Sequence, residues 1–115
     1  MKLSITTLGL MATATMWVSL PGIAAAQEPD GAALYDSNCK MCHGAEGVPP
    51  PAMAKAMKVP TFADPAVLDG VSEDSALSVI EKGFGPMKGF KGKLTRNEEV
   101  ALVQYIRTFA KKESK

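Results

Sequence analysis

The chain carries Cys39-Lys40-Met41-Cys42-His43, and this stretch decides the predicted fold. Its spacing, C-x-x-C-H, is the attachment signature of a c-type haem. Residues three apart share one face of a helical turn, so both thiols can reach one porphyrin edge and add to its vinyl groups. His43 follows at once and is the only histidine in the chain. We therefore expect Cys39 and Cys42 to hold one haem covalently, and His43 to ligate its iron.

Other uses of the two cysteines fit the sequence less well. A thioredoxin-like redox disulfide belongs in a βαβ context, which the chain does not offer. A zinc site needs further Cys or His ligands, and the sequence holds no second cluster of them. A structural disulfide between residues three apart closes too small a loop to stabilise the fold much.

Residues 1–26 have the features of a secretory signal peptide. Lys2 is followed by an apolar run that ends at Pro21, and Ala24-Ala25-Ala26 offers an A-x-A cleavage site. An uncleaved membrane anchor is the alternative, but the run is short for a spanning helix and is diluted by Ser and Thr. We predict cleavage, no permanent membrane span, and a periplasmic haem-bearing domain over residues 27–115, since such haems are attached outside the bacterial inner membrane.

The length and charge of the chain limit the classes of function that it can have. Residues 27–115 make one small domain, whose core would be marginal without a staple such as a covalently held haem. Without Lys2 the chain has 12 basic and 12 acidic side chains, and no arginine cluster. This balance does not indicate nucleic-acid binding. We expect a monomer.

Periodicity predicts an all-α domain. Asp30 is a candidate N-cap for a helix ending at Asn38, and Ser72 for one that stops at Gly83. Thr95-Arg96-Asn97-Glu98 forms a capping box that opens the strongest helix, about residues 97–111. A short helix is expected over 52–58, with an irregular stretch over 59–69 and loops over 44–51 and 85–93. No stretch alternates every two residues, so no sheet is expected.

Methionine is the natural candidate for a second axial ligand, because no other histidine is present and both cysteines are used by thioethers. Met41 lies inside the attachment motif and cannot reach the far face of the haem. Met53 and Met57 are four apart in a helical segment, a spacing more typical of core packing, and they stay open as weaker alternatives. Met87 lies in a loop between two helices, from which a thioether can fold over the haem. Met87 is therefore the favoured ligand.

This ligand set predicts electron transfer rather than catalysis. A thioether is a soft ligand that favours ferrous iron and raises the reduction potential. With His43 and Met87 both bound, the iron has no open position for oxygen or peroxide. One-electron transfer with little rearrangement is the expected chemistry.

The chain is similar to the small class I cytochromes c of bacteria. The similarity covers nearly all of residues 27–115. It is carried by the haem motif with Gly44, the proline loop at 49–51, the loop over residues 83–90 that holds Met87 (the Met loop), and the terminal helix with Tyr105-Ile106. The resemblance implies three to five short helices and loops wrapped around one covalent haem.

The resemblance also implies roles for several residues. Gly31 and Tyr35 would cross the terminal helix near Leu102 and Tyr105, where glycine allows close approach. A backbone carbonyl of the proline loop, by spacing that of Pro51, would accept a hydrogen bond from His43. Tyr35, Pro51 and Phe90 would line the haem pocket. The chain departs from the family at Lys88, where a proline often follows the ligand methionine.

Lysines gather in the segments that border the haem edge in this family. These are Lys40 in the motif and Lys88, Lys91 and Lys93 around the Met loop. Such a ring could steer an acidic redox partner, or could be an ordinary solvated face. Two other functions remain open: a haem subunit of a larger oxidoreductase, and a haem sensor or peroxidase-like protein with a labile sixth ligand.

Overall fold

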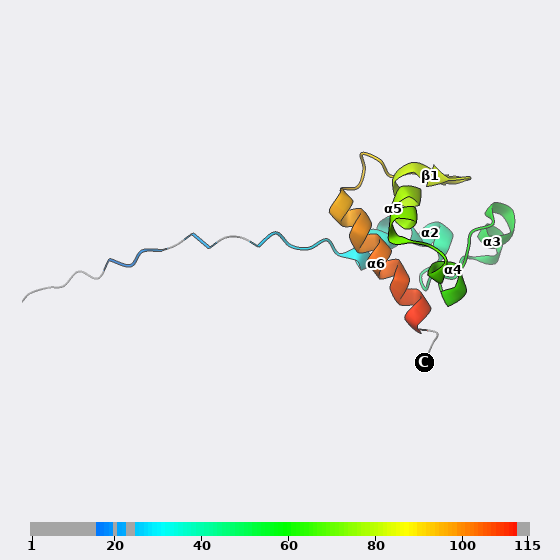
Figure 1. Cartoon of the computed structure of the whole chain (residues 1–115), viewed down its shortest axis with the longest axis horizontal. Helices are drawn as coiled ribbons and strands as arrows, with labels where there is room; N and C mark the ends of the chain where they lie inside the picture. Colours follow the sequence, from blue (N-terminus) through cyan, green and yellow to red (C-terminus); the bar gives the residue numbers. More distant parts are fainter. Residues whose placement is uncertain (1–15, 20, 23–24, 113–115) are drawn as a thin grey trace, which may run out of the picture.

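The computed structural model describes residues 16–19, 21–22 and 25–112 of the chain. Most of the predicted signal peptide, residues 1–26, lies outside them, so its cleavage stays a prediction. The described residues before Gly31 form no helix or strand and lead away from the helical body (Figure 1). No helix in the described part of the chain is long and apolar enough to cross a membrane.

Six helices and one very small hairpin form the described domain (Figure 1). The all-α expectation is confirmed, although the helices exceed the expected three to five. In chain order the elements are α1 (Gly31–Asn38), α2 (Lys40–His43), α3 (Pro51–Met57), α4 (Pro65–Asp69), α5 (Glu73–Lys82), β1 (Gly83–Phe84), β2 (Met87–Lys88) and α6 (Arg96–Lys112).

The predicted helix starts are confirmed by their caps. The Asp30 carboxylate accepts hydrogen bonds from the backbone N–H groups of Ala32 and Ala33, which opens α1. Ser72 caps α5 in the same way, and that helix ends at Gly83 with a φ of 84°. At the start of α6 the Thr95 N–H donates to the Glu98 carboxylate at 2.7 Å, which is one half of a capping box.

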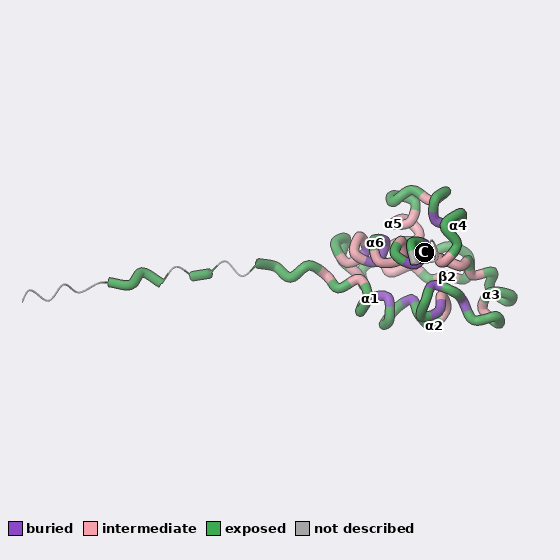
Figure 2. Tube along the Cα trace, turned by 90° about the horizontal axis from the view of Figure 1, so that it is seen from below, coloured by how far each residue is buried: buried purple, intermediate pink, exposed green. Residues whose placement is uncertain are grey.

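The crossing of α1 and α6 organises the core, as expected from Gly31 and Tyr35. A Cβ at Gly31 would lie 2.4 Å from the Ala101 carbonyl oxygen, so only glycine allows this approach. One turn later the Tyr35 ring packs against Tyr105 and Phe109, with centroids 5.5 and 5.0 Å away. Buried residues gather where the two helices meet (Figure 2).

Helix α4 corrects the expectation of an irregular stretch over 59–69. Pro65, read as a helix breaker, occupies the first helical position, where its fixed φ is suitable and its missing N–H costs nothing. Asp64 caps the helix by accepting from the Ala66 N–H at 2.9 Å. From α6, the Arg107 guanidinium donates to the Val71 carbonyl at 2.8 Å and so ties the end of this segment to the core.

The β1–β2 hairpin corrects the expectation of no sheet. Gly83 pairs with Lys88 and Phe84 with Met87 in an antiparallel ladder. Strands of two residues are too short to show the alternation by which strands are recognised in a sequence.

Helix α3 corrects the expectation that Met53 and Met57 pack in the core. None of its residues is buried, and Met57 is 45% exposed. Their four-residue spacing does place them on one face, but that face does not join the buried cluster formed mainly by α1, α5 and α6.

Candidate functional site

The two cysteines lie at the junction of α1 and α2. Cys39 is buried and separates the two helices, while Cys42 is half-buried one turn later; both are free thiols. Burial raises the pKa of the Cys39 thiol to about 11. Reactive redox cysteines have a lowered pKa, so the raised pKa of Cys39 disfavours a thioredoxin-like role. No group of three or more potential metal-binding His, Cys, Asp or Glu side chains occurs among the described residues, which disfavours the zinc alternative.

His43 closes α2 and is half-buried. Burial lowers the pKa of His43, which favours the neutral form that ligates metals. Its Nδ1 atom is buried and has no hydrogen-bond partner among the described residues. The bond expected to the Pro51 carbonyl is therefore absent. Pro51 is exposed and begins α3, where a carbonyl points along the helix axis toward the helix's own N–H groups.

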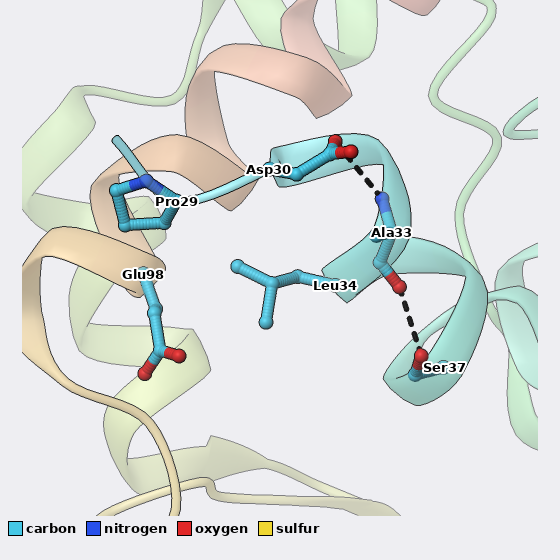
Figure 3. A pocket seen from close by; sticks show the side chains of 6 residues that line it. All are labelled: Pro29, Asp30, Ala33, Leu34, Ser37 and Glu98. Carbon is cyan, nitrogen blue, oxygen red and sulfur yellow. Dashed lines mark hydrogen bonds between the residues drawn. The ribbon is translucent and has the colours of Figure 1, made fainter. Parts of the chain in front are cut away.

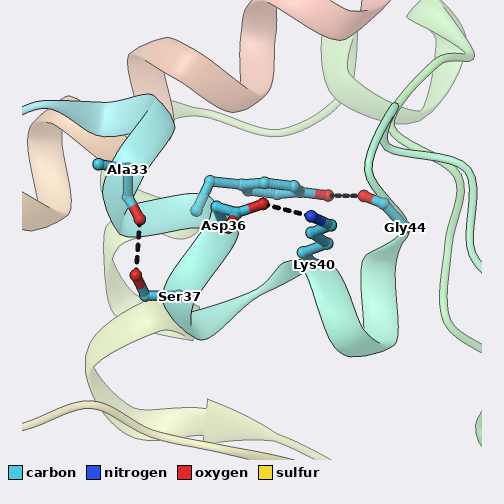
Figure 4. A network of polar contacts seen from close by, with 6 residues as sticks. Ala33, Asp36, Ser37, Lys40 and Gly44 are labelled. Carbon is cyan, nitrogen blue, oxygen red and sulfur yellow. Dashed lines mark hydrogen bonds and ion pairs between the residues drawn. The ribbon is translucent and has the colours of Figure 1, made fainter.

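Tyr35 holds the turn that follows the motif. Its buried hydroxyl donates to the Gly44 carbonyl at 2.7 Å (Figure 4). Gly44 has a φ of 79°, and an added Cβ there would collide with the Val48 carbonyl, so the turn requires glycine. Burial raises the pKa of Tyr35, which keeps its hydroxyl protonated as a donor. Tyr35 thus connects α1 to the residue directly after His43.

Met87 lies on β2, half-buried, opposite Phe84 on β1. Two glycines seat this Met loop against the end of α5. A Cβ at Gly83 would lie 2.4 Å from the Met87 carbonyl oxygen, and a Cβ at Gly89 would lie 2.4 Å from that of Glu81. The loop that carries Met87 is therefore held by close backbone packing.

Phe90 ends the Met loop and anchors it. Its N–H donates to the Ile80 carbonyl at 2.8 Å, and its ring is half-buried against the core cluster. The structure thus places the expected pocket residues Tyr35 and Phe90 on the core, whereas Pro51 lies on the surface.

A hollow of about 270 Å³ lies elsewhere, beside the starts of α1 and α6 (Figure 3). It is open to solvent, and none of the expected haem-binding residues lines it. The lining residues are Pro29, Asp30, Ala33, Leu34, Ser37 and Glu98.

Phe62 is a residue of the site that the sequence did not indicate. Its ring stacks on that of His43, with centroids 4.5 Å apart and an interplanar angle of 14°. It lies in the irregular segment between α3 and α4, where no periodicity marks one residue above another. Only its aromatic character in a polar and proline-rich stretch could have singled it out.

The donor chemistry of these residues suits one haem. Two thiols lie three residues apart on the motif turn, the adjacent histidine favours its neutral form, and a thioether is available on a closely packed loop. The thiols would attach the haem as thioethers, and the neutral imidazole and the soft thioether are groups that can ligate its iron.

The comparisons with known proteins agree with this chemistry. Residues 26–106 match the family model described as "Cytochrome C oxidase, cbb3-type, subunit III". Among solved structures, the KustC0563 c-type cytochrome is 36% identical with a TM-score of 0.65, over 70% of this chain and 96% of that one. A tyrosine-to-phenylalanine mutant of Kustc0563 gives 34% identity and a TM-score of 0.64, over 70% and 98%. No curated protein matches.

Proposed function

This chain belongs to the cytochrome c family of the cbb3-type oxidase subunit III, and we propose that it carries single electrons between redox partners in the periplasm. It is a small all-α monohaem cytochrome with a covalently bound haem c. The haem supplies the redox centre, an iron that cycles between ferrous and ferric states.

The proposed attachment uses Cys39 and Cys42 as thioethers and His43 and Met87 as axial ligands. One observation carries the proposal: a single motif turn presents two free thiols next to a half-buried histidine, the arrangement that attaches one haem. Met87 is supported by its loop, which glycine packing holds against α5. Met41 and Met57 are 83% and 45% exposed. Met53 is half-buried like Met87, so Met87 is favoured over it by the closely packed loop that carries it and not by burial.

In this proposal, the protein's own part in electron transfer is to occupy both ligand positions of the iron and to keep the surrounding chain rigid. Tyr35 fixes the turn after His43 through the Gly44 carbonyl, while Phe90 ties the Met loop to α5. Because both expected ligands come from restrained segments, a change of iron charge would require little motion of the chain. Low rearrangement is what a carrier needs for rapid exchange with its partners.

Replacing Met87 tests the proposed ligation. The wild-type ferric protein should show the weak far-red absorption band of an iron–thioether bond, and Met87→Ala should lose it. Met57→Ala is the matched control, since this half-exposed methionine lies on α3 and should leave the band unchanged. A band that survives in Met87→Ala but disappears in Met57→Ala would show that Met57 is the ligand and that the assignment to Met87 is wrong.

We further propose that the lysines around the Met loop steer an acidic redox partner. Lys88, Lys91 and Lys93 are exposed, and none forms an ion pair with a described carboxylate. Lys40 differs, because its ammonium is paired with the Asp36 carboxylate at 2.5 Å (Figure 4). The steering charge is therefore assigned to Lys88, Lys91 and Lys93, while the charge of Lys40 is compensated by Asp36.

Salt dependence tests this surface. Electron exchange with an acidic protein should slow as ionic strength rises, because screening weakens steering beyond about 10 Å at 0.1 M salt. The Lys91→Gln/Lys93→Gln double variant should flatten that dependence. The Lys55→Gln/Lys111→Gln variant removes the same charge from exposed positions elsewhere and should keep the wild-type slope. Equal slopes in both variants would leave the ring without a steering role.

The family description favours one second candidate, a haem subunit docked on a larger oxidoreductase. Size-exclusion chromatography of the protein purified from its native periplasm distinguishes the two functions. A free carrier elutes at the mass of one chain, whereas a docked subunit co-elutes with a larger partner in stoichiometric amounts.

A further inference from the structure

The imidazole of His43 lacks the restraint that usually orients a metal-bound histidine. Such a histidine generally donates its second ring N–H to a carbonyl, carboxylate or water, and this bond fixes the rotation of the ring. Here the Nδ1 atom is buried without a hydrogen-bond partner among the described residues. No described protein group fills this role, so a packed side chain is the candidate for defining the ring plane.

The Phe62 ring supplies that contact. It lies nearly parallel to the imidazole, 4.5 Å away between centroids. Rotation of the histidine about its Cβ–Cγ bond would turn the imidazole edge into the phenyl face and break the stack. Stacked and edge-to-face pairs are both favourable, so the restraint is steric: with the phenyl face only 4.5 Å away, the imidazole cannot turn its edge toward it unless one ring moves.

Phe62 can act in this way because its own position is fixed by the loop that follows the motif. Its N–H donates to the Gly47 carbonyl at 2.7 Å. Gly47 has a φ of 76°, and a Cβ there would lie 2.8 Å from the Phe109 ring and 3.1 Å from the Phe62 Cβ. Gly47 in turn donates to the Gly44 carbonyl at 3.2 Å. The phenyl ring is thus coupled through two successive hydrogen bonds to Gly44, the residue directly after His43.

We propose that Phe62 is a positioning residue that sets the plane of the His43 imidazole above the haem, in place of a hydrogen bond at Nδ1. This inference rests on the proposed ligation of iron by His43. The imidazole plane decides which iron d orbital overlaps the ligand π system, and so how unpaired spin spreads over the ferric haem. Phe62 thereby controls the electronic structure of the centre without touching the iron.

Paramagnetic spectra of ferric holoprotein variants test the proposal. Phe62→Leu keeps an apolar side chain of similar volume but removes the flat face, whereas Phe62→Tyr keeps the face. We expect Phe62→Leu to shift the largest g-value and to reorder the haem methyl resonances, while Phe62→Tyr stays close to wild type. The far-red band should persist in both, because Met87 is untouched. If Phe62→Leu yields no holoprotein, Phe62→Met carries the same test.

Two failures can be told apart. A wild-type spectrum without a histidine-ligated low-spin signal would overturn the ligation, and with it this inference. A normal wild-type spectrum that Phe62→Leu and Phe62→Met leave unchanged would overturn the inference alone. Equal shifts in Phe62→Tyr and Phe62→Leu would also contradict it, because loss of the stacked face would then not be the cause.

Discussion

The Gly31→Ala variant tests how tightly the helix crossing beneath the haem motif is packed. The added Cβ would lie 2.4 Å from the Ala101 carbonyl oxygen and 3.0 Å from the Tyr105 Cβ. Ordinary contacts begin near 3.4 Å, so α1 and α6 must separate by about 1 Å. Overpacking of this kind costs up to about 3 kcal/mol. Alanine regains up to about 1 kcal/mol over glycine in a helix, which leaves a net loss of about 2 kcal/mol.

Thermal unfolding of the holoprotein measures this loss. For a domain of this size, about 2 kcal/mol corresponds to a Tm lower by roughly 8 to 16 °C. Gly70→Ala is the matched control, because Gly70 has a φ of −80° and nothing within 4 Å of an added Cβ. That variant should gain about 0.4–1 kcal/mol through the unfolded state. If Gly31→Ala is as stable as Gly70→Ala, the close crossing is not what requires glycine.

Three further variants test other contacts of the fold. Tyr35→Phe should lower the free energy of unfolding, measured by chemical denaturation, by about 1 kcal/mol. It removes one buried hydrogen bond to the Gly44 carbonyl, which still accepts a second from the Gly47 N–H. An unchanged denaturation midpoint would contradict this. The hydrogen bonds from Thr95 lower the pKa of Glu98 below its usual range, so they stabilise the fold above that range and this stability is lost as pH falls through the lowered pKa. Glu98→Gln should flatten acid unfolding in this window, and an identical acid profile would refute the assignment. Gly83→Ala should weaken the far-red band, since its Cβ meets the facing strand and its φ of 84° strains any side chain; an intact band would show that the Met loop tolerates displacement.

Much of this fold could be predicted because its helix starts depend on local contacts. Asp30, Ser72 and the Thr95 capping box each act within four residues, so their partners are visible in the sequence. The Gly31 crossing was accessible only through the resemblance to class I cytochromes c, since the partner helix lies about seventy residues away along the chain.

The features that could not be predicted from the sequence depend on contacts between distant segments, or on residue types that occur in more than one structural setting. Pro65 starts a helix here, although the same residue type breaks helices elsewhere. The β1–β2 hairpin is too short to leave a periodic signal. Phe62 reaches His43 across the proline loop, and Pro51, chosen by spacing, is taken up by α3. Spacing along a chain does not fix direction in space.

The central claim, a closed iron that passes one electron, is tested most directly by carbon monoxide added to the ferrous protein. With His43 and Met87 both bound, the absorption spectrum should not change on exposure to carbon monoxide, and a redox titration should follow a single reversible one-electron step. Rapid formation of a carbon monoxide adduct by the wild-type protein would contradict the account, because it would reveal a labile sixth position and favour a sensor or peroxidase-like function.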